Sequence, residues 1–173
     1  ANYEAIVWFL QEVYPRVLEQ RPDVQLIVTG DHRNLPLPES HNVTLTGFVD
    51  DVRPVIARST ISLAPLRIGG GTRVKILEAM ALHTPVIATS KGAEGLGMQH
   101  GTHLLIADTA DDFAAAVVRL LEDSRLRQRL AENAYNAVRR MYDWAGVMPR
   151  FLAIVDQTAR ARVPAGSDSV TVS

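Results

Sequence analysis

The sequence contains no cysteine among its 173 residues. This absence excludes disulfide bonds, a thiolate nucleophile and a zinc site built on cysteine. The five histidines are scattered and show no spacing typical of metal ligands. The sequence therefore predicts no metal site.

Long hydrophobic runs and a strong net charge are missing as well. No apolar run approaches the length of a membrane span, and no signal peptide opens the chain. The formal net charge of −1 argues against nucleic acid or an anionic membrane as the main partner. With 47% hydrophobic and 21% charged residues, the chain has the composition and length of one globular domain with a real core. We expect it to be cytoplasmic.

The most informative stretch, residues 61–96, reads ISLAPLRIGGGTRVKILEAMALHTPVIATSKGAEGL. It opens with a short apolar strand that Pro65 ends, followed by the three glycines 69–71. A helix is expected from Thr72 to about Leu82, because the Thr72 hydroxyl can accept a hydrogen bond from an amide of the first turn. Pro85 ends this helix, and a buried strand over residues 86–88 precedes a second glycine loop over residues 89–92.

The start of this expected helix suits an anion. Free amides and the positive end of the helix dipole favour negative charge there, and glycines let a phosphate approach the backbone. Arg73 and Lys75 add two cations within the first turn. Glu78 is the one acid of an otherwise apolar helix, and it needs a partner because an unpaired buried carboxylate is costly.

Two partners for Glu78 stay open at this point. A pair of sugar or ribose hydroxyls satisfies the carboxylate, and so does Lys75 three residues earlier. The first alternative makes the stretch a site for a diphosphate beside a polyhydroxyl group, as in a nucleotide sugar. Three glycines alone are often only a turn, and the stretch matches neither the P-loop, which ends in GK[ST], nor the glycine spacing of the dinucleotide fingerprint.

The rest of the chain alternates strands with helices, which predicts a parallel sheet covered by helices on both faces. Ligands of such sheets bind beyond the carboxyl ends of the strands. We expect strands over residues 24–29, 43–46 and 103–106. We expect helices over residues 3–20 (capped by Asn2), from Asp50 to Arg58, and over residues 111–121, 124–142 and 144–159, the last capped by Asp143.

The phrase LEAMALHTPVIAT followed by GAEGL resembles the donor-binding core of glycosyltransferase family 4 (group 1), whose members have the GT-B fold. The similarity extends through PDVQLIVTG, NVTLTGFVDDV and the terminal helices, and it covers residues 1 to 157 or so. It corresponds to the carboxyl-terminal half of such an enzyme.

The resemblance implies an α/β fold, a Rossmann-like doubly wound parallel sheet that forms the carboxyl-terminal half of a GT-B fold, with its first strand missing. Residues 1–160 would be the nucleotide-sugar-binding domain and residues 161–173 a carboxyl-terminal tail. The enzyme would transfer a sugar from a nucleoside diphosphate sugar with retention of configuration and without a metal or other cofactor. The acceptor groups, and any contact with a membrane surface, would belong to an amino-terminal domain that this chain lacks, so we expect the chain alone to be inactive.

The resemblance also implies roles for individual residues. Arg73, Lys75 and Glu78 are the candidate catalytic residues: the two cations would hold the diphosphate, and Glu78 would bind the ribose hydroxyls. The backbone near Phe48 and Val49 would hold the base. The full set of expected nucleotide-binding residues is Gly30, Phe48, Val49, Gly69, Gly70, Gly71, Thr72, Arg73, Lys75 and Glu78.

Two positions depart from the family pattern. The family commonly has a further Glu where this chain has Gly70, so the sugar contact made by that acid is missing or is made by the glycine-loop backbone. His83 stands where a Gly usually closes the helix. Because a His can adopt the left-handed conformation at some cost, we interpret His83 as structural.

Other functions stay open beside the transferase. The chain could be a non-catalytic nucleotide-binding module, a nucleotide-sugar epimerase-like half, or a degenerate domain kept for partner contacts. An epimerase would need His and acidic groups in the cleft, which the sequence does not clearly offer.

The ends of the chain raise a further question. A missing central strand would leave two rows of backbone groups without partners. The tail over residues 169–173 alternates β-branched with polar residues and could pair with a sheet. Alternatively, the remaining strands close directly on one another.

Overall fold

The structure, a computed structural model, describes residues 1–30, 35–71 and 73–142. Its contacts define a first unit, Ala1–Ala137, and a second unit, Val138–Ser173, of which the structure describes only residues 138–142. Several predictions lie outside the described residues, among them the helix over 144–159, the domain boundary at 160/161 and the pairing of the tail strand. They stay predictions.

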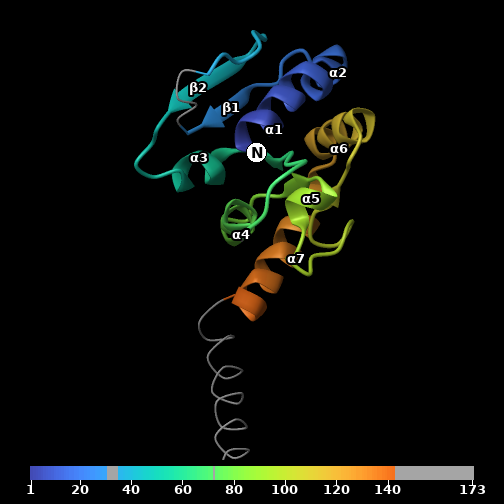
Figure 1. The fold of residues 1–173 in the computed structure, drawn as a ribbon. Coiled ribbons are helices and arrows are strands. Elements are labelled where there is room, and N and C mark those ends of the chain that lie inside the picture. The colour runs from blue at the N-terminus through green and yellow to red at the C-terminus, as the bar shows by residue number, and fades with distance from the viewer. Residues whose placement is uncertain (31–34, 72, 143–173) are drawn as a thin grey trace, which may run out of the picture. The chain divides into compact units, whose positions relative to one another are not determined.

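From β2 to α6, strands and helices alternate along the chain, whereas no helix is described between β1 and β2 (Figure 1). The described strands are β1 (Leu26–Thr29), β2 (Val43–Gly47), β3 (Ser62–Ala64), β4 (Val86–Ala88) and β5 (Leu105–Ile106). The described helices are α1 (Asn2–Trp8), the π-helical turn η1 (Phe9–Val13), α2 (Tyr14–Gln20), α3 (Arg53–Arg58), α4 (Val74–Ala81), α5 (Ser90–Ala93), α6 (Ala110–Glu122) and α7 (Ser124–Tyr142).

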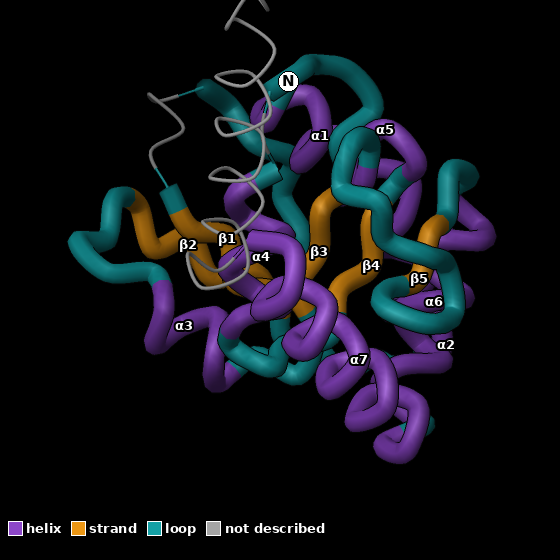
Figure 2. The backbone as a smooth tube through the Cα atoms, turned by 90° about the horizontal axis from the view of Figure 1, so that it is seen from below, coloured by secondary structure: helices purple, strands orange, loops and turns teal. Residues whose placement is uncertain are grey.

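The strands form two parallel sheets rather than one. β1 pairs with β2, with Leu26 opposite Val43, and β4 lies between β3 and β5. Figure 2 shows the two groups of strands apart from each other. The parallel α/β fold is therefore confirmed, whereas direct closure of the remaining strands is wrong. β1 and β3 each keep one edge without a strand partner in the part of the chain that the structure describes.

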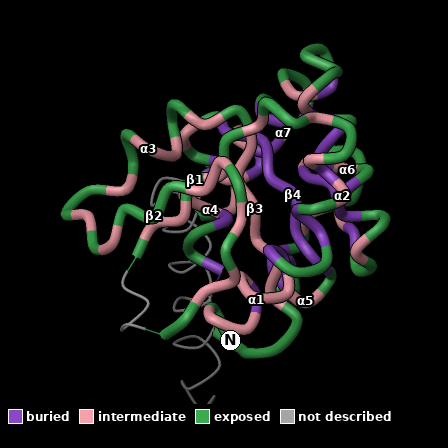
Figure 3. Tube along the Cα trace, turned by 90° about the horizontal axis from the view of Figure 1, so that it is seen from above, coloured by how far each residue is buried: buried purple, intermediate pink, exposed green. Residues whose placement is uncertain are grey.

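The core lies between the amino-terminal helical segment, α6 and the larger sheet. Phe9, Val13 and Val17 of that segment are buried together with Phe113 of α6. The Phe113 ring lies edge-on to Trp8 and to Phe9, with centroids 5.8 and 5.9 Å apart. All of β4 is buried, as Figure 3 shows, whereas β1 and β2 have intermediate and exposed positions. Burial of each large side chain contributes about 1.5–3 kcal/mol, so this packing carries much of the stability.

The amino-terminal helix differs from the expected uniform helix over residues 3–20. Asn2 is its first helical residue rather than its cap, because Ala1 occupies the N-cap position. A π-helical turn, η1, interrupts it just before Pro15. Proline has no N–H group for the carbonyl four residues earlier, and a local change of hydrogen-bond pattern accommodates that loss.

Three helix starts and one loop also need correction. α3 begins at Arg53, whose N–H donates to Asp51 Oδ1 at 3.0 Å. Asp51, rather than Asp50, therefore accepts the hydrogen bond at the start of this helix. α4 begins at Val74 with Arg73 in the N-cap position, and the predicted cap, Thr72, lies outside the described residues.

The expected glycine loop over residues 89–92 contains the short helix α5 instead. α6 begins one residue earlier than predicted, while the start of α7 at Ser124 is confirmed; the residues after Tyr142 lie outside the described ranges. No helix in the described ranges is long and apolar enough to cross a membrane.

The central place of Phe113 gives a test of this core. The Phe113→Ala substitution should lower the free energy of unfolding by about 3–5 kcal/mol, because it leaves a cavity against Trp8 and Phe9. Phe48 is the matched control, since its 78% exposed ring has little packing to lose. Urea unfolding of both variants measures the difference. Equal losses in the two variants would contradict the core described above.

Candidate functional site

The glycine loop, residues 65–71 between β3 and α4, is the centre of the candidate site. Gly69 and Gly71 have φ values of +107° and +95°, which a residue with a side chain adopts only with strain. A Cβ atom added to Gly70 or Gly71 would meet nothing within 4 Å. The loop therefore offers an open backbone surface to a ligand, as the sequence predicts.

The start of α1 packs against this loop. A Cβ atom added to Gly69 would lie 3.1 Å from Ala1 Cβ. Glu4 Oε1 lies 3.6 Å from Arg67 Nη1, and the Arg67 guanidinium lies 5.3 Å from the centroid of the Trp8 ring, in cation–π range. Sequence reasoning missed Glu4 and Arg67, because no local pattern shows that the first helix returns to the glycine loop.

Arg73 is the most deeply buried of the predicted cations. Its side chain is only 6% exposed, although it occupies the N-cap position of α4. Nη2 donates to the carbonyl oxygens of Lys91 at 2.8 Å and Gly69 at 3.5 Å, and it lies 3.4 Å from Glu94 Oε2. Nε is buried and has no hydrogen-bond partner among the described residues. Arg73 thus connects the glycine loop to α5 and retains one unused donor.

Thr89 and Gly92 hold α5 close to the end of β3. Thr89 caps α5, accepting a hydrogen bond from the Gly92 N–H at 2.8 Å and donating its own hydroxyl to the Leu66 carbonyl. A Cβ atom added to Gly92 would lie 2.6 Å from the Ala64 carbonyl oxygen, so only glycine fits there. The loops after β3 and β4 are therefore held in one arrangement.

The loop after β5 is hydrogen-bonded to α5, next to the loops after β3 and β4. Asp108 accepts hydrogen bonds from the Ser90 N–H at 2.7 Å and from the Ser90 hydroxyl at 2.6 Å. The carboxyl ends of β3, β4 and β5 thus meet at one edge of their sheet, where ligands of parallel sheets bind.

Lys75 and Glu78 stand further along α4. Lys75 is exposed and Glu78 is half-buried. No ion pair joins these two described side chains, so the structure does not contain the Lys75 pairing that the sequence left open for Glu78. The Glu78 charge acts on Arg53 of α3: it is the smallest of the causes that raise the pKa of Arg53, after the hydrogen bond and the charge of Asp51.

Gly30, Phe48 and Val49 lie together at the ends of β1 and β2. The Gly30 N–H donates to the Gly47 carbonyl at 2.8 Å, and the Phe48 side chain is 78% exposed. α1 contacts both the segment before β2 and the glycine loop: Tyr3 donates its hydroxyl to the Pro36 carbonyl at 2.6 Å, and Glu4 Oε1 lies 3.6 Å from Arg67 Nη1.

His83 behaves as the sequence predicts. It has a left-handed conformation with φ of 55° directly after α4. Its ring stacks on Tyr135 with centroids 3.9 Å apart, and Nδ1 lies 3.7 Å from Glu132 Oε2. These contacts join the end of α4 to α7, which supports the structural interpretation.

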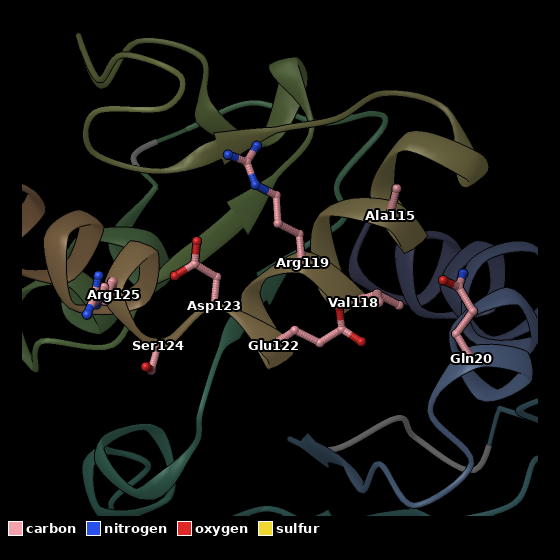
Figure 4. A pocket seen from close by; sticks show the side chains of 8 residues that line it. All are labelled: Gln20, Ala115, Val118, Arg119, Glu122, Asp123, Ser124 and Arg125. Carbon is pink, nitrogen blue, oxygen red and sulfur yellow. The ribbon is translucent and has the colours of Figure 1, made fainter.

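A pocket of about 530 Å³ lies elsewhere, between α2 and the turn from α6 to α7 (Figure 4). Asp123 on its wall caps α7 through the Leu126 N–H at 2.9 Å. None of its lining residues comes from a loop at a strand end, so it is separate from the candidate site. The described residues also contain no group of three or more His, Asp or Glu side chains that could hold a metal.

Comparisons with known proteins match this chain to one family. The model of the family described as "Glycosyl transferases group 1" matches residues 1–123. The phosphatidyl-myo-inositol mannosyltransferase of Mycobacterium leprae is 32% identical over 159 residues, covering 87% of this chain and 42% of the relative. The chain thus spans about two fifths of the length of the curated relatives it matches, 39% and 42% for two of them.

Solved structures show the same fold. Anabaena HepE in complex with UDP and glucose has a TM-score of 0.67 at 22% identity, over 87% of this chain and 45% of that one. The carboxyl-terminal domain of LpcC, a glycosyl transferase group 1 family protein of Francisella tularensis, has a TM-score of 0.63 at 23% identity, over 82% of this chain and 78% of that one. The predicted Rossmann-like fold is confirmed.

The close approach at Gly92 provides a test of the site geometry. Gly92→Ala should lower the free energy of unfolding by about 1–3 kcal/mol, because the new methyl group would press on the Ala64 carbonyl. Gly70→Ala is the control, since the open surroundings there should keep the change within about 0.5 kcal/mol. Chemical unfolding of the two variants gives the comparison. A Gly92→Ala variant as stable as the parent would refute the locked position of α5.

Proposed function

The chain belongs to the group 1 glycosyl transferases, and we propose that it binds a nucleoside diphosphate sugar at the glycine loop and the start of α4. In the complete enzyme the sugar passes to an acceptor with retention of configuration, and the nucleoside diphosphate leaves. The crystallised complexes of HepE with UDP and with UDP-glucose support a nucleotide-sugar donor.

One observation carries this proposal. Arg73 places a buried guanidinium, with its Nε still unpartnered among the described residues, at the N-cap position of α4 and beside the open glycine loop. Buried charge-bearing donors without acceptors are rare, because the lost hydration must be replaced. A phosphate oxygen is the acceptor that a guanidinium and a helix start both favour.

The diphosphate would be held by protein groups alone, without a metal ion. The amides of Gly70, Gly71 and Thr72 and the side chains of Arg73 and Lys75 supply donors and positive charge. The same groups stabilise the charge that develops on the diphosphate as the glycosidic bond breaks, which is the expected catalytic contribution.

The nucleoside would extend from this point toward the ends of β1 and β2. Glu78, which lacks an ion pair with Lys75, would accept hydrogen bonds from the ribose hydroxyls. Gly30 and the backbone near Phe48 and Val49 would hold the base.

The remaining parts of the reaction fall to the rest of the enzyme. The chain spans 42% of its mycobacterial relative, so we place the acceptor-binding groups in an amino-terminal domain of the same protein. That domain would also make any contact with a membrane surface, and the whole enzyme would act in the cytoplasm without a nucleic-acid partner. Assays with the 173-residue chain should show donor binding and no sugar transfer.

Lys75 gives the cleaner test of the diphosphate site, because Arg73 also holds the fold together. Charge-assisted hydrogen bonds contribute about 1.5–3 kcal/mol, so Lys75→Ala should weaken the binding of UDP, GDP or ADP, whichever binds, about tenfold or more. Calorimetry measures the dissociation constant. Arg129→Ala, which removes an exposed cation of α7, should leave it unchanged. An unaltered affinity in Lys75→Ala would remove Lys75 from the site.

The role of Glu78 requires two ligands. Glu78→Gln should weaken nucleoside diphosphate binding several-fold, because the diol loses a charged acceptor, while inorganic diphosphate should bind as before. Glu19→Gln, on the exposed side of α2, controls for the change in net charge. Equal losses for both ligands, or no loss for either, would argue against a diol contact.

A further inference from the structure

A single carboxylate oxygen in α5 lies between two cations beside the glycine loop. Glu94 Oε2 lies 2.6 Å from Lys91 Nζ and 3.4 Å from Arg73 Nη2. We propose, resting on the nucleotide-sugar site above, that Lys91 is a further cation of the diphosphate site and that Glu94 is its internal counter-ion, which an anionic oxygen of the ligand displaces.

The three side chains differ in how firmly they are held. Arg73 is 6% exposed and donates to two backbone carbonyl groups, so it cannot leave its position without breaking the contact between the loops. Glu94 is 58% exposed, stands at the carboxyl end of α5, and forms ion pairs with Arg73 and Lys91. Glu94 is therefore the group that can turn into solvent at little cost.

The carboxylate satisfies the charge of Arg73 incompletely. Its oxygen lies 3.4 Å from Nη2, longer than the distance of about 2.7–2.9 Å at which charge-assisted hydrogen bonds are strongest. Nε remains buried without an acceptor in the described ranges. A phosphate group carries several acceptor oxygens, and a guanidinium fork can bind two of them at once. An anionic ligand would thus satisfy Arg73 better than Glu94 does.

The charge state of Glu94 fits this role. The hydrogen bond and the charge of Lys91 hold the pKa of Glu94 below its ordinary value, and the charge of Arg73 lowers it further. The carboxylate is consequently ionised at neutral pH and competes with any anion for the same two cations. The ligand must displace it, and the affinity of the site for anions is lower than the two cations alone would give.

The position of Lys91 allows its ammonium group to contact the anionic ligand directly. Its backbone carbonyl accepts a hydrogen bond from Arg73 at 2.8 Å, so the residue is anchored while its side chain, 39% exposed, reaches Glu94, three residues further along the chain. Once Glu94 turns away, the Lys91 ammonium and the Arg73 guanidinium face the same vacated position. The Lys91 charge is then available to the ligand without any movement of the backbone.

Calorimetric titration of the 173-residue chain with inorganic diphosphate tests the proposal. Glu94→Gln removes the competing charge and keeps the shape, so diphosphate should bind more tightly, by up to about fivefold, the upper end of the range that exposed ion pairs span. Lys91→Gln should weaken binding by a similar factor. Glu19→Gln changes the net charge equally at a distant site and should leave the affinity unchanged. Glu94→Ala and circular dichroism confirm that the effect comes from the lost charge and not from altered folding.

The outcomes separate this proposal from the one on which it rests. If the parent chain binds diphosphate and Lys75→Ala weakens it, but Glu94→Gln binds equally or less tightly, the counter-ion proposal is wrong while the donor site stands. If Lys91→Gln leaves the affinity unchanged, Lys91 does not belong to the site. If the parent chain does not bind diphosphate at millimolar concentration, both proposals fail together.

Discussion

The candidate site depends on one buried positive charge. The Arg73 guanidinium has lost most of its contact with water, and its hydration must be replaced by acceptors from the protein. Those acceptors are the Gly69 carbonyl, the Lys91 carbonyl and the Glu94 carboxylate, which belong to the glycine loop and to α5. Satisfying this one group therefore fixes both loops relative to the start of α4. The Arg73 guanidinium thus has a structural role in the free chain and, in the proposed function, also binds the diphosphate.

Small residues make this arrangement rigid. Thr89 joins α5 to the Leu66 carbonyl, Gly92 permits its close approach to Ala64, and Asp108 adds the loop after β5 through Ser90. α5 follows β4 in the chain, and all residues of β4 are buried, so α5 is attached to a strand that lies in the core. A ligand that binds here meets groups already in place and spends little free energy on ordering them.

The sequence predicts best those features that depend on local chemistry. The start of α7, the bounds of β4 and the left-handed conformation of His83 follow from capping residues, apolar runs and the position of a helix end. α5 could not be predicted, because SKGA has no helical pattern and owes its conformation to contacts with β3 and the loop that follows it. The contact of Arg73 with Lys91 and Glu94 spans 18 and 21 residues, and no periodicity connects such positions. The open glycine loop could be predicted from its three consecutive glycines, whereas the groups that surround it could not.

The split between the two sheets has a consequence for the whole site. Hydrogen bonds hold β1 to β2 and β3 to β4 to β5, but no ladder joins the two sheets in the described chain. Side chains of the helical segment contact both sheets: the Tyr14 hydroxyl lies 3.2 and 3.3 Å from the carbonyl oxygens of Val24 and Asn42, next to β1 and β2, and Phe9 lies in one buried cluster with Ile87 of β4 and Leu105 of β5. The base-binding end and the diphosphate end of the proposed site are therefore connected by packing, which yields more readily than a strand ladder. A nucleotide that contacts both ends would add the direct connection that the sheets lack, and would stabilise the fold by the free energy of its own binding.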